Sequence, residues 1–154
     1  MPGISRIVVP IDFSDHSKQA FRYAIGFAKT FNAELILVYV VEPVVYPADF
    51  SFGQVALPSM EMELHKRGKQ QLDALIEKEV PADLRARSIV RAGKPFVEII
   101  HVAQEEQADL IIIATHGHSG LEHVLFGSTA EKVVRKADCP VLSVRAGDRN
   151  FTLP

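Results

Sequence analysis

The chain has 154 residues, of which 47% are apolar and 23% charged, with a formal net charge of -2. This length suits one domain, and these fractions are ordinary for a globular protein and exclude extensive disorder. No run of Lys and Arg exceeds two residues, so we expect no nucleic-acid partner. No stretch approaches the ~20 apolar residues of a membrane-spanning helix, so we expect no membrane partner either.

The single cysteine, Cys139, cannot form an internal disulfide and suits a reducing compartment. The first residues lack the apolar run and small-residue cleavage site of a secretory signal. We therefore expect a soluble cytoplasmic protein. Cys139 precedes Pro140 at the expected start of a strand, and we interpret it as a small buried apolar side chain.

Short apolar runs alternate with longer amphipathic ones from the first residues onward. The run over residues 4–11 predicts a strand that ends at Asp12, and Ser14 is a candidate N-cap for the helix that follows. The nearly continuous apolar run over 34–41 is typical of a strand covered on both faces. Pro43 ends it.

Residues 43–59 interrupt this alternation with three prolines and several large apolar side chains. Loops of this length are usually functional or without fixed structure. Two interpretations stay open: a crossover segment, partly mobile or packed against the body, and a lid or partner contact.

The second half continues the alternation. Residues 84–90 alternate polar and apolar side chains, which indicates a strand at the edge of a sheet with one face in water. Ala130, Val133, Val134 and Ala137 mark the apolar face of the last helix. The expected elements are a helix over 60–78, a strand over 84–90, a helix around 96–103, a strand over 109–115, a helix around 130–137 and a strand over 140–144.

This regular βαβ alternation predicts an α/β fold of three layers, with a five-stranded parallel sheet between helices. Right-handed crossovers leave few topologies, and periodicity alone leaves the strand orders 2-1-3-4-5 and 3-2-1-4-5 both open. We expect one domain over residues 1–154, with its core at about 4–145 and a loose tail over 146–154.

The most informative segment is 115–129, which follows a buried strand and contains Gly117, Gly120 and Gly127. It ends in Ser128 and Thr129, where a helix is expected to begin. Glycines let backbone N–H groups approach phosphate oxygens, and a helix start offers unpaired donors to an anion. A simpler interpretation stays open, in which Ser128 caps the helix and the glycines only turn the chain.

Other sites are less well supported. The sequence has no Walker A loop, no G-x-G-x-x-G and no G-x-S-x-G, and no acid–base pair can be placed together. The expected third strand ends without the acidic cluster of a receiver domain. His116, His118 and His123 lack a nearby fourth zinc ligand, so we interpret them as solvated or facing phosphate. His101 is expected near the surface of its helix.

Four stretches of the chain resemble the universal stress protein family, and the likeness covers about residues 4–145. They are 7–14, 37–41, 114–117 continuing to 127–129, and 139–144. Nucleotide-binding members of that family carry G-x2-G-x9-G-(S/T), and this chain reads Ala114-x2-Gly117-x9-Gly127-Ser128. The alanine adds a methyl group beside the sugar, which costs about 1 kcal/mol if the contact is tight and nothing if the backbone has no positive φ.

The resemblance implies strand order 3-2-1-4-5, an adenine nucleotide alpha-hydrolase-like fold, and ATP or AMP bound over the first and fourth strands. By the same resemblance, Asp12 would bond the base or ribose or approach a metal-bound water, with Mg²⁺ present only on the phosphates. The implied neighbours of the base and ribose are Pro10, Asp12, Val40, Ile113 and Ala114. Those of the phosphates are Gly117, His118, Gly127, Ser128 and Thr129.

The resemblance also implies a role in stress response or signalling as a homodimer that pairs through the last strand, with Val141 and Val144 at the interface. We expect at most slow ATP hydrolysis. The competing hypothesis is a dimeric interaction protein of the same family that does not bind nucleotide.

Overall fold

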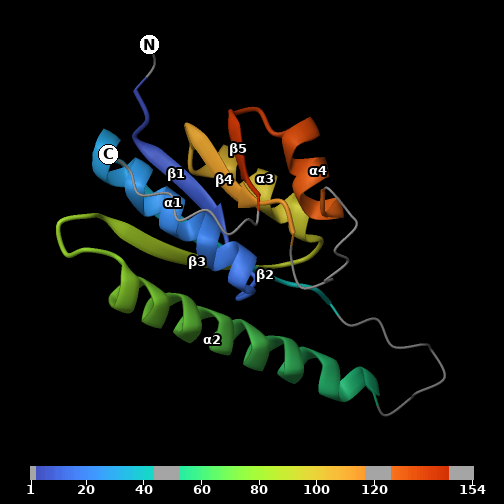
Figure 1. The fold of residues 1–154 in the computed structure, drawn as a ribbon. Helices are drawn as coiled ribbons and strands as arrows, with labels where there is room; N and C mark the ends of the chain where they lie inside the picture. Colours follow the sequence, from blue (N-terminus) through green and yellow to red (C-terminus); the bar gives the residue numbers. More distant parts are fainter. Residues whose placement is uncertain (1–2, 44–52, 117–125, 146–154) are drawn as a thin grey trace.

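The computed structural model describes residues 3–43, 53–116 and 126–145. Strands and helices alternate along the described chain (Figure 1). The elements are β1 Arg6–Pro10, α1 Asp15–Phe31, β2 Glu34–Val41, α2 Gly53–Glu79, β3 Ala86–Ala92, α3 Pro95–Glu105, β4 Leu110–Ala114, α4 Ser128–Lys136 and β5 Val141–Val144.

The five strands form one parallel sheet in the order β3-β2-β1-β4-β5. This confirms one of the two orders that the sequence left open. Arg6 at the start of β1 lies opposite Glu34 of β2, and Ile111 of β4 lies opposite Val141 of β5. Because β1 has β2 on one side and β4 on the other, the chain reverses direction across the sheet at the β1–β4 pair.

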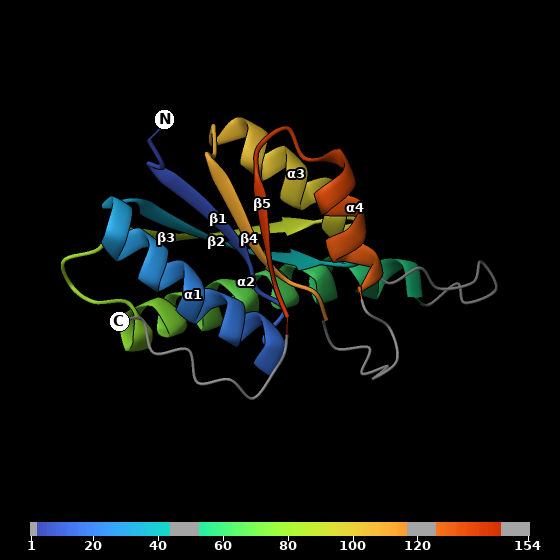
Figure 2. The same ribbon diagram turned by 45° about the horizontal axis from the view of Figure 1, so that its top comes forward.

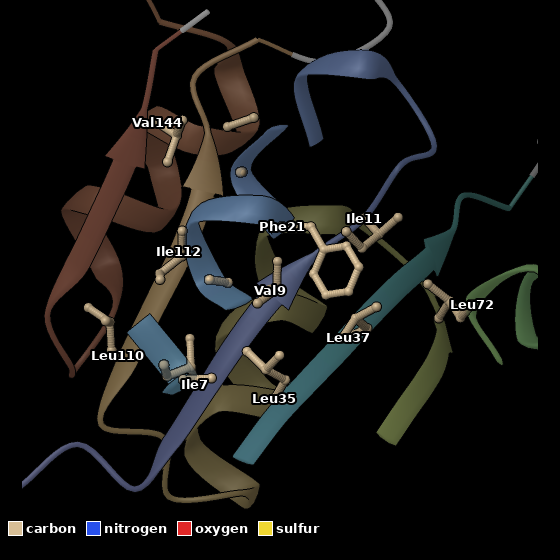
Figure 3. Packing of buried hydrophobic residues seen from close by; sticks show 14 of the residues in the cluster. Ile7, Val9, Ile11, Phe21, Leu35, Leu37, Leu72, Leu110, Ile112 and Val144 are labelled. Carbon is tan, nitrogen blue, oxygen red and sulfur yellow. The ribbon is translucent and has the colours of Figure 1, made fainter. Parts of the chain in front are cut away.

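Helices cover both faces of the sheet, α1 and α2 on one and α3 and α4 on the other (Figure 2). Alternate residues of each strand supply the two cores, because successive side chains point to opposite faces. Val9 and Leu37 pack on the side of α1 with Phe21, which lies against β1 and β2 (Figure 3). Val8 and Ile111 pack on the side of α3 and α4.

The start of α1 agrees with the prediction that Ser14 caps it. The Ser14 hydroxyl accepts a hydrogen bond from the Ser17 N–H at 3.2 Å. Phe13, just before the cap, has a φ of 64°, a conformation that side chains other than glycine rarely adopt. This turn therefore fixes the direction in which the chain leaves β1.

The helix expected over 60–78 is longer, since α2 begins at Gly53. The expectation of a loop through residue 59 was wrong for 53–59. Pro58 lies in the second turn of α2, where proline disfavours a helix, and this is why the sequence predicted a loop there. The remaining part of the predicted loop, 44–52, lies outside the described residues.

Smaller differences concern boundaries and burial. β3 begins and ends two residues later than the expected 84–90, and it lies at the sheet edge as predicted. Val134 is 44% exposed, so the apolar face of α4 is narrower than the sequence suggested. Cys139 is partly rather than fully buried. Within the part of the chain that is described, no helix is long and apolar enough to span a bilayer.

Candidate functional site

A cleft of about 500 Å³ opens beyond the carboxyl ends of β1, β2 and β4, at the point where the strand order reverses. Ligands of open parallel sheets bind at such points. The predicted site residues that the structure describes all line this cleft: Pro10, Asp12, Val40, Ile113, Ala114, Gly127, Ser128 and Thr129. Gly117 and His118 lie outside the described residues.

Gly127 joins the start of α4 to the end of β4. Its N–H donates to the carbonyl of Thr115, and a Cβ at this position would lie 2.9 Å from that oxygen. Its φ is -65°, so glycine is needed here for close approach and not for an unusual backbone conformation. The Gly127 amide, one of the expected phosphate donors, is thus already paired within the protein.

The interpretation of Ser128 as the helix cap is wrong, because Gly127 occupies the N-cap position and no side chain caps α4. The first backbone bond of the helix runs from the Glu131 N–H to the Gly127 carbonyl at 3.0 Å. Within the described residues, the N–H groups of Ser128, Thr129 and Ala130 have no acceptor. Unpaired N–H groups and the positive end of the helix dipole thus lie beside the cleft.

Asp12 is held at the end of β1 by the turn into α1. Its Oδ1 accepts from the Ser14 N–H at 2.9 Å and also from the Ser14 hydroxyl. Its own N–H donates to the Ser17 hydroxyl at 3.3 Å. These bonds keep a carboxylate in the cleft wall.

Ala114, which replaces the first glycine of the family motif, ends β4. It is not among the residues with positive φ, and its methyl group belongs to the core on the side of α1. The backbone at this position therefore does not require glycine. Alanine in place of glycine at position 114 therefore has no conformational cost.

Several lining residues were not predicted, because their strands and helices gave no signal beyond apolar periodicity. Val38 and Ile99 extend the cleft wall on the side of α3, and Tyr39 and Leu64 extend it on the side of α2. The other residues outside the predicted set are Ile11, Ser17, Val41, Glu42 and Pro95, and His116, interpreted from the sequence as solvated or facing phosphate, also lines the cleft. Their positions at strand ends and helix starts were the only available signal.

Tyr39 reaches α2 through Gly68. A Cβ at Gly68 would lie 2.3 Å from the Tyr39 Cδ1, and the Tyr39 ring also packs against Phe13 with centroids 5.1 Å apart. The absence of a side chain at Gly68 therefore sets how closely α2 approaches the cleft.

The resolved shifts in pKa lie away from the cleft. The Arg87 guanidinium lowers the pKa of the Glu106 carboxyl by hydrogen bonding, and Glu106 in turn raises the pKa of Arg87. Arg87 also pairs with Glu34 at 3.1 Å, near the amino ends of the strands. Burial raises the pKa of the Cys139 thiol, which keeps it protonated and unreactive.

The described residues contain no group of three His, Cys, Asp or Glu side chains that could hold a metal ion. Two of the histidines considered for zinc, His118 and His123, lie outside the described ranges. Asp12 alone supplies too few ligands for a metal held by the protein.

Residues 3–145 match the sequence model of the Universal stress protein family. The chain belongs to this family. Universal stress protein MJ0531 of Methanocaldococcus jannaschii is 37% identical over 143 residues, which cover 91% of this chain and 81% of that protein. This identity and coverage agree with the match to the family.

Solved structures agree with the fold. The structure of MJ0577, also from Methanocaldococcus jannaschii, superposes with a TM-score of 0.82 at 25% identity, covering 96% of this chain and 100% of that one. A universal stress protein crystallised in complex with cAMP superposes with a TM-score of 0.61 at 25% identity, covering 93% of this chain and 98% of that one. Its ligand is an adenine nucleotide.

Proposed function

We propose that this universal stress protein binds an adenine nucleotide, ATP or AMP, in the cleft beside β1 and β4. The observation that carries this proposal is the set of N–H groups of Ser128, Thr129 and Ala130, which lack acceptors within the described residues. A phosphate at a helix N-terminus gains hydrogen bonds from such donors and a favourable interaction with the helix dipole.

The rest of the cleft suits a base and a sugar. Val38, Val40 and Ile99 offer an apolar wall to a planar base, and Asp12 offers a carboxylate to hydroxyl or amino donors. A volume of about 500 Å³ lies in the range of small-molecule sites. In this proposal the nucleotide lies with its base toward β2 and its phosphate toward α4.

The family relationship favours the adenine class. One structural neighbour is a universal stress protein in complex with cAMP. This chain keeps Gly127 and Ser128 of the family motif at the cleft, and Ala114 imposes no conformational penalty there. Mg²⁺ enters the proposal only on the phosphates of ATP, because Asp12 is the one metal-binding group that we assign to it.

Ligand-dependent stability tests the proposal. A nucleotide present at about 100 times its Kd stabilises the folded state by about 2.7 kcal/mol, which urea unfolding measures directly. We expect AMP or ATP to raise the unfolding midpoint and GMP to do so less. No shift at millimolar concentration of any nucleotide would favour the competing hypothesis of an interaction protein without a nucleotide. Mass spectrometry of nucleotide released on denaturation identifies the ligand.

We also propose that the protein is a homodimer that pairs through β5. Among the described strands β5 bonds only to β4, so its other edge has no strand partner within the described part of the chain. The carbonyls of Pro140 and Val144 accept bonds from Ile111 and Thr115, so the backbone groups of Val141 and Ser143 point to the open edge. An open edge strand is a ready site for pairing with a second chain.

Val144 cannot serve this interface as we expected from the sequence. Its side chain is 7% exposed and belongs to the core on the side of α1. A charged substitution there would disturb the fold before it disturbed a dimer. Val141 is only partly buried and stays in the proposal.

A further inference from the structure

The described lining of the cleft is poor in positive charge. It holds two carboxylates, Asp12 and Glu42, and neither lysine nor arginine occurs among the lining residues that the structure describes. A nucleotide phosphate placed there meets one described side chain that can carry a positive charge, the imidazole of His116.

His116 lies next to the proposed phosphate donors. A Cβ built at Gly127 would be 3.9 Å from the His116 Cα, so the two backbones pass close together. The bond from the Gly127 N–H to the Thr115 carbonyl fixes this arrangement. His116 therefore lies within side-chain reach of an anion at the start of α4.

One nitrogen of the ring is already engaged. The His116 Nδ1 lies 3.0 Å from the hydroxyl oxygen of Thr115, a buried residue. If the hydroxyl donates to Nδ1, the neutral ring carries its proton on Nε2, and a protonated ring carries one there as well. In both charge states Nε2 is then a donor.

A second ring holds the imidazole from the side of α1. The His16 and His116 centroids are 5.7 Å apart with an interplanar angle of 43°. His16 lies in the first turn of α1, so this contact spans the gap between α1 and the end of β4. The ring of His116 is thus positioned from two directions.

We propose that His116 binds a phosphate oxygen of the nucleotide through Nε2, with Thr115 as the positioning residue that sets the tautomer. This inference rests on the proposed nucleotide site and adds a side-chain donor to its backbone donors.

The test compares AMP with adenosine by calorimetric titration. His116→Leu removes the donor, and we expect AMP to bind about tenfold more weakly while adenosine binding is unchanged. His116→Gln keeps an N–H donor near the position of Nε2, so it should bind AMP much as the unmodified protein does.

Thr115 has a matched pair of variants. Thr115→Val should weaken AMP binding several-fold and leave adenosine binding unchanged, while Thr115→Ser keeps the hydroxyl and should behave like the unmodified protein. An equal loss for AMP and adenosine in Thr115→Val would mean a structural role only. His101→Gln, on the exposed side of α3, is the control for changing a histidine.

The outcomes separate the two proposals. If the unmodified protein binds neither AMP nor adenosine, the proposed function fails and this inference with it. If it prefers AMP to adenosine but His116→Leu has the same preference, the nucleotide site stands and the role of His116 is overturned. Adenosine affinity reports whether each variant is folded.

Discussion

The Gly127 amide donates a hydrogen bond to the Thr115 carbonyl, and this bond ties the start of α4 to the end of β4. Because the N-cap residue is Gly127, the helix begins with no side-chain cap, and its first free N–H donors lie beside the cleft. The close approach of Gly127 and Thr115 is possible because glycine has no Cβ.

Gly127→Ala should destabilise the fold and weaken nucleotide binding together. The added Cβ would lie 2.9 Å from the Thr115 oxygen, so the start of α4 must move away from β4. We expect a loss of about 1–3 kcal/mol in the free energy of unfolding by urea. Gly3→Ala is the control, because a Cβ there meets nothing within 4 Å. Equal stability of the two variants would contradict this account of Gly127.

Ser128→Ala should weaken AMP binding without lowering the stability of the fold. Ser128 is not the N-cap of α4, so we expect the unfolding midpoint to stay nearly unchanged while AMP binds about tenfold more weakly. Ser14→Ala is the matched comparison, because Ser14 does cap α1 and its loss should cost about 1 kcal/mol. A comparable loss of stability in Ser128→Ala would show that its hydroxyl supports the helix instead.

Gly68→Ala should be destabilising although alanine is the better helix former. In an exposed helix this change stabilises by about 1 kcal/mol, but here the Cβ would lie 2.3 Å from the Tyr39 ring. In the Tyr39→Ala background the clash is gone, and the same change should become stabilising. A double-mutant cycle by urea unfolding measures this reversal of sign. Additive effects would show that the two residues do not constrain each other.

Arg87→Met should lower stability at neutral pH by less than about 1 kcal/mol, because the pairs that it removes are partly exposed. The Glu106 pKa is lowered in the folded state, so this contribution is present above the pKa of Glu106 in the unfolded chain. It is lost as the pH falls through the folded value. The two proteins should therefore converge as the pH falls below the ordinary pKa of a glutamate, about 4.3, and through the lowered folded pKa of Glu106.

The pair formed by Arg135 and Glu131 gives the control for Arg87. Arg135 is 74% exposed and lies on one helix with its partner, so Arg135→Met should change stability little at any pH. If the difference between Arg87→Met and the unmodified protein grew in acid, the assigned direction of the Glu106 pKa would be wrong.

Ser143→Pro tests the proposed dimer with little damage to the monomer. The Ser143 N–H points to the open edge of β5, so proline removes no bond to β4. We expect the unmodified protein to sediment as a dimer and the variant as a monomer with a similar unfolding midpoint. An unmodified protein that stays monomeric at high micromolar concentration contradicts the proposal.

The fold was largely predictable because its elements differ strongly in pattern. β2 and β4 are nearly continuous apolar runs, and α1 combines helical spacing with a serine cap. The strand order was not predictable from periodicity, since each candidate order buries the same faces. The start of α2 was missed because Pro58 is locally a helix breaker, and the helix continues through it.

Asp12 and Gly127 both line the cleft, as their places after β1 and before α4 led us to expect, and their roles in binding stay predictions. Tyr39 was missed, because its place in the cleft depends on its contact with Gly68, which only the folded chain brings about. His116 was interpreted as solvated or facing phosphate, but its contact with Thr115 could not be predicted. The hydrogen bond from the Gly127 amide to Thr115 could not be predicted either, because the close approach of two loops produces no periodic pattern in the sequence.

The most direct test of the central claim is the chemical shift of the Ser128, Thr129 and Ala130 amides, measured by ¹⁵N NMR during titration with AMP and with adenosine. The account predicts that AMP moves these three amide signals strongly and that adenosine moves them little while shifting Val40 and Ile113. If saturating AMP leaves the amides of Ser128, Thr129 and Ala130 where they were, no phosphate binds at the start of α4.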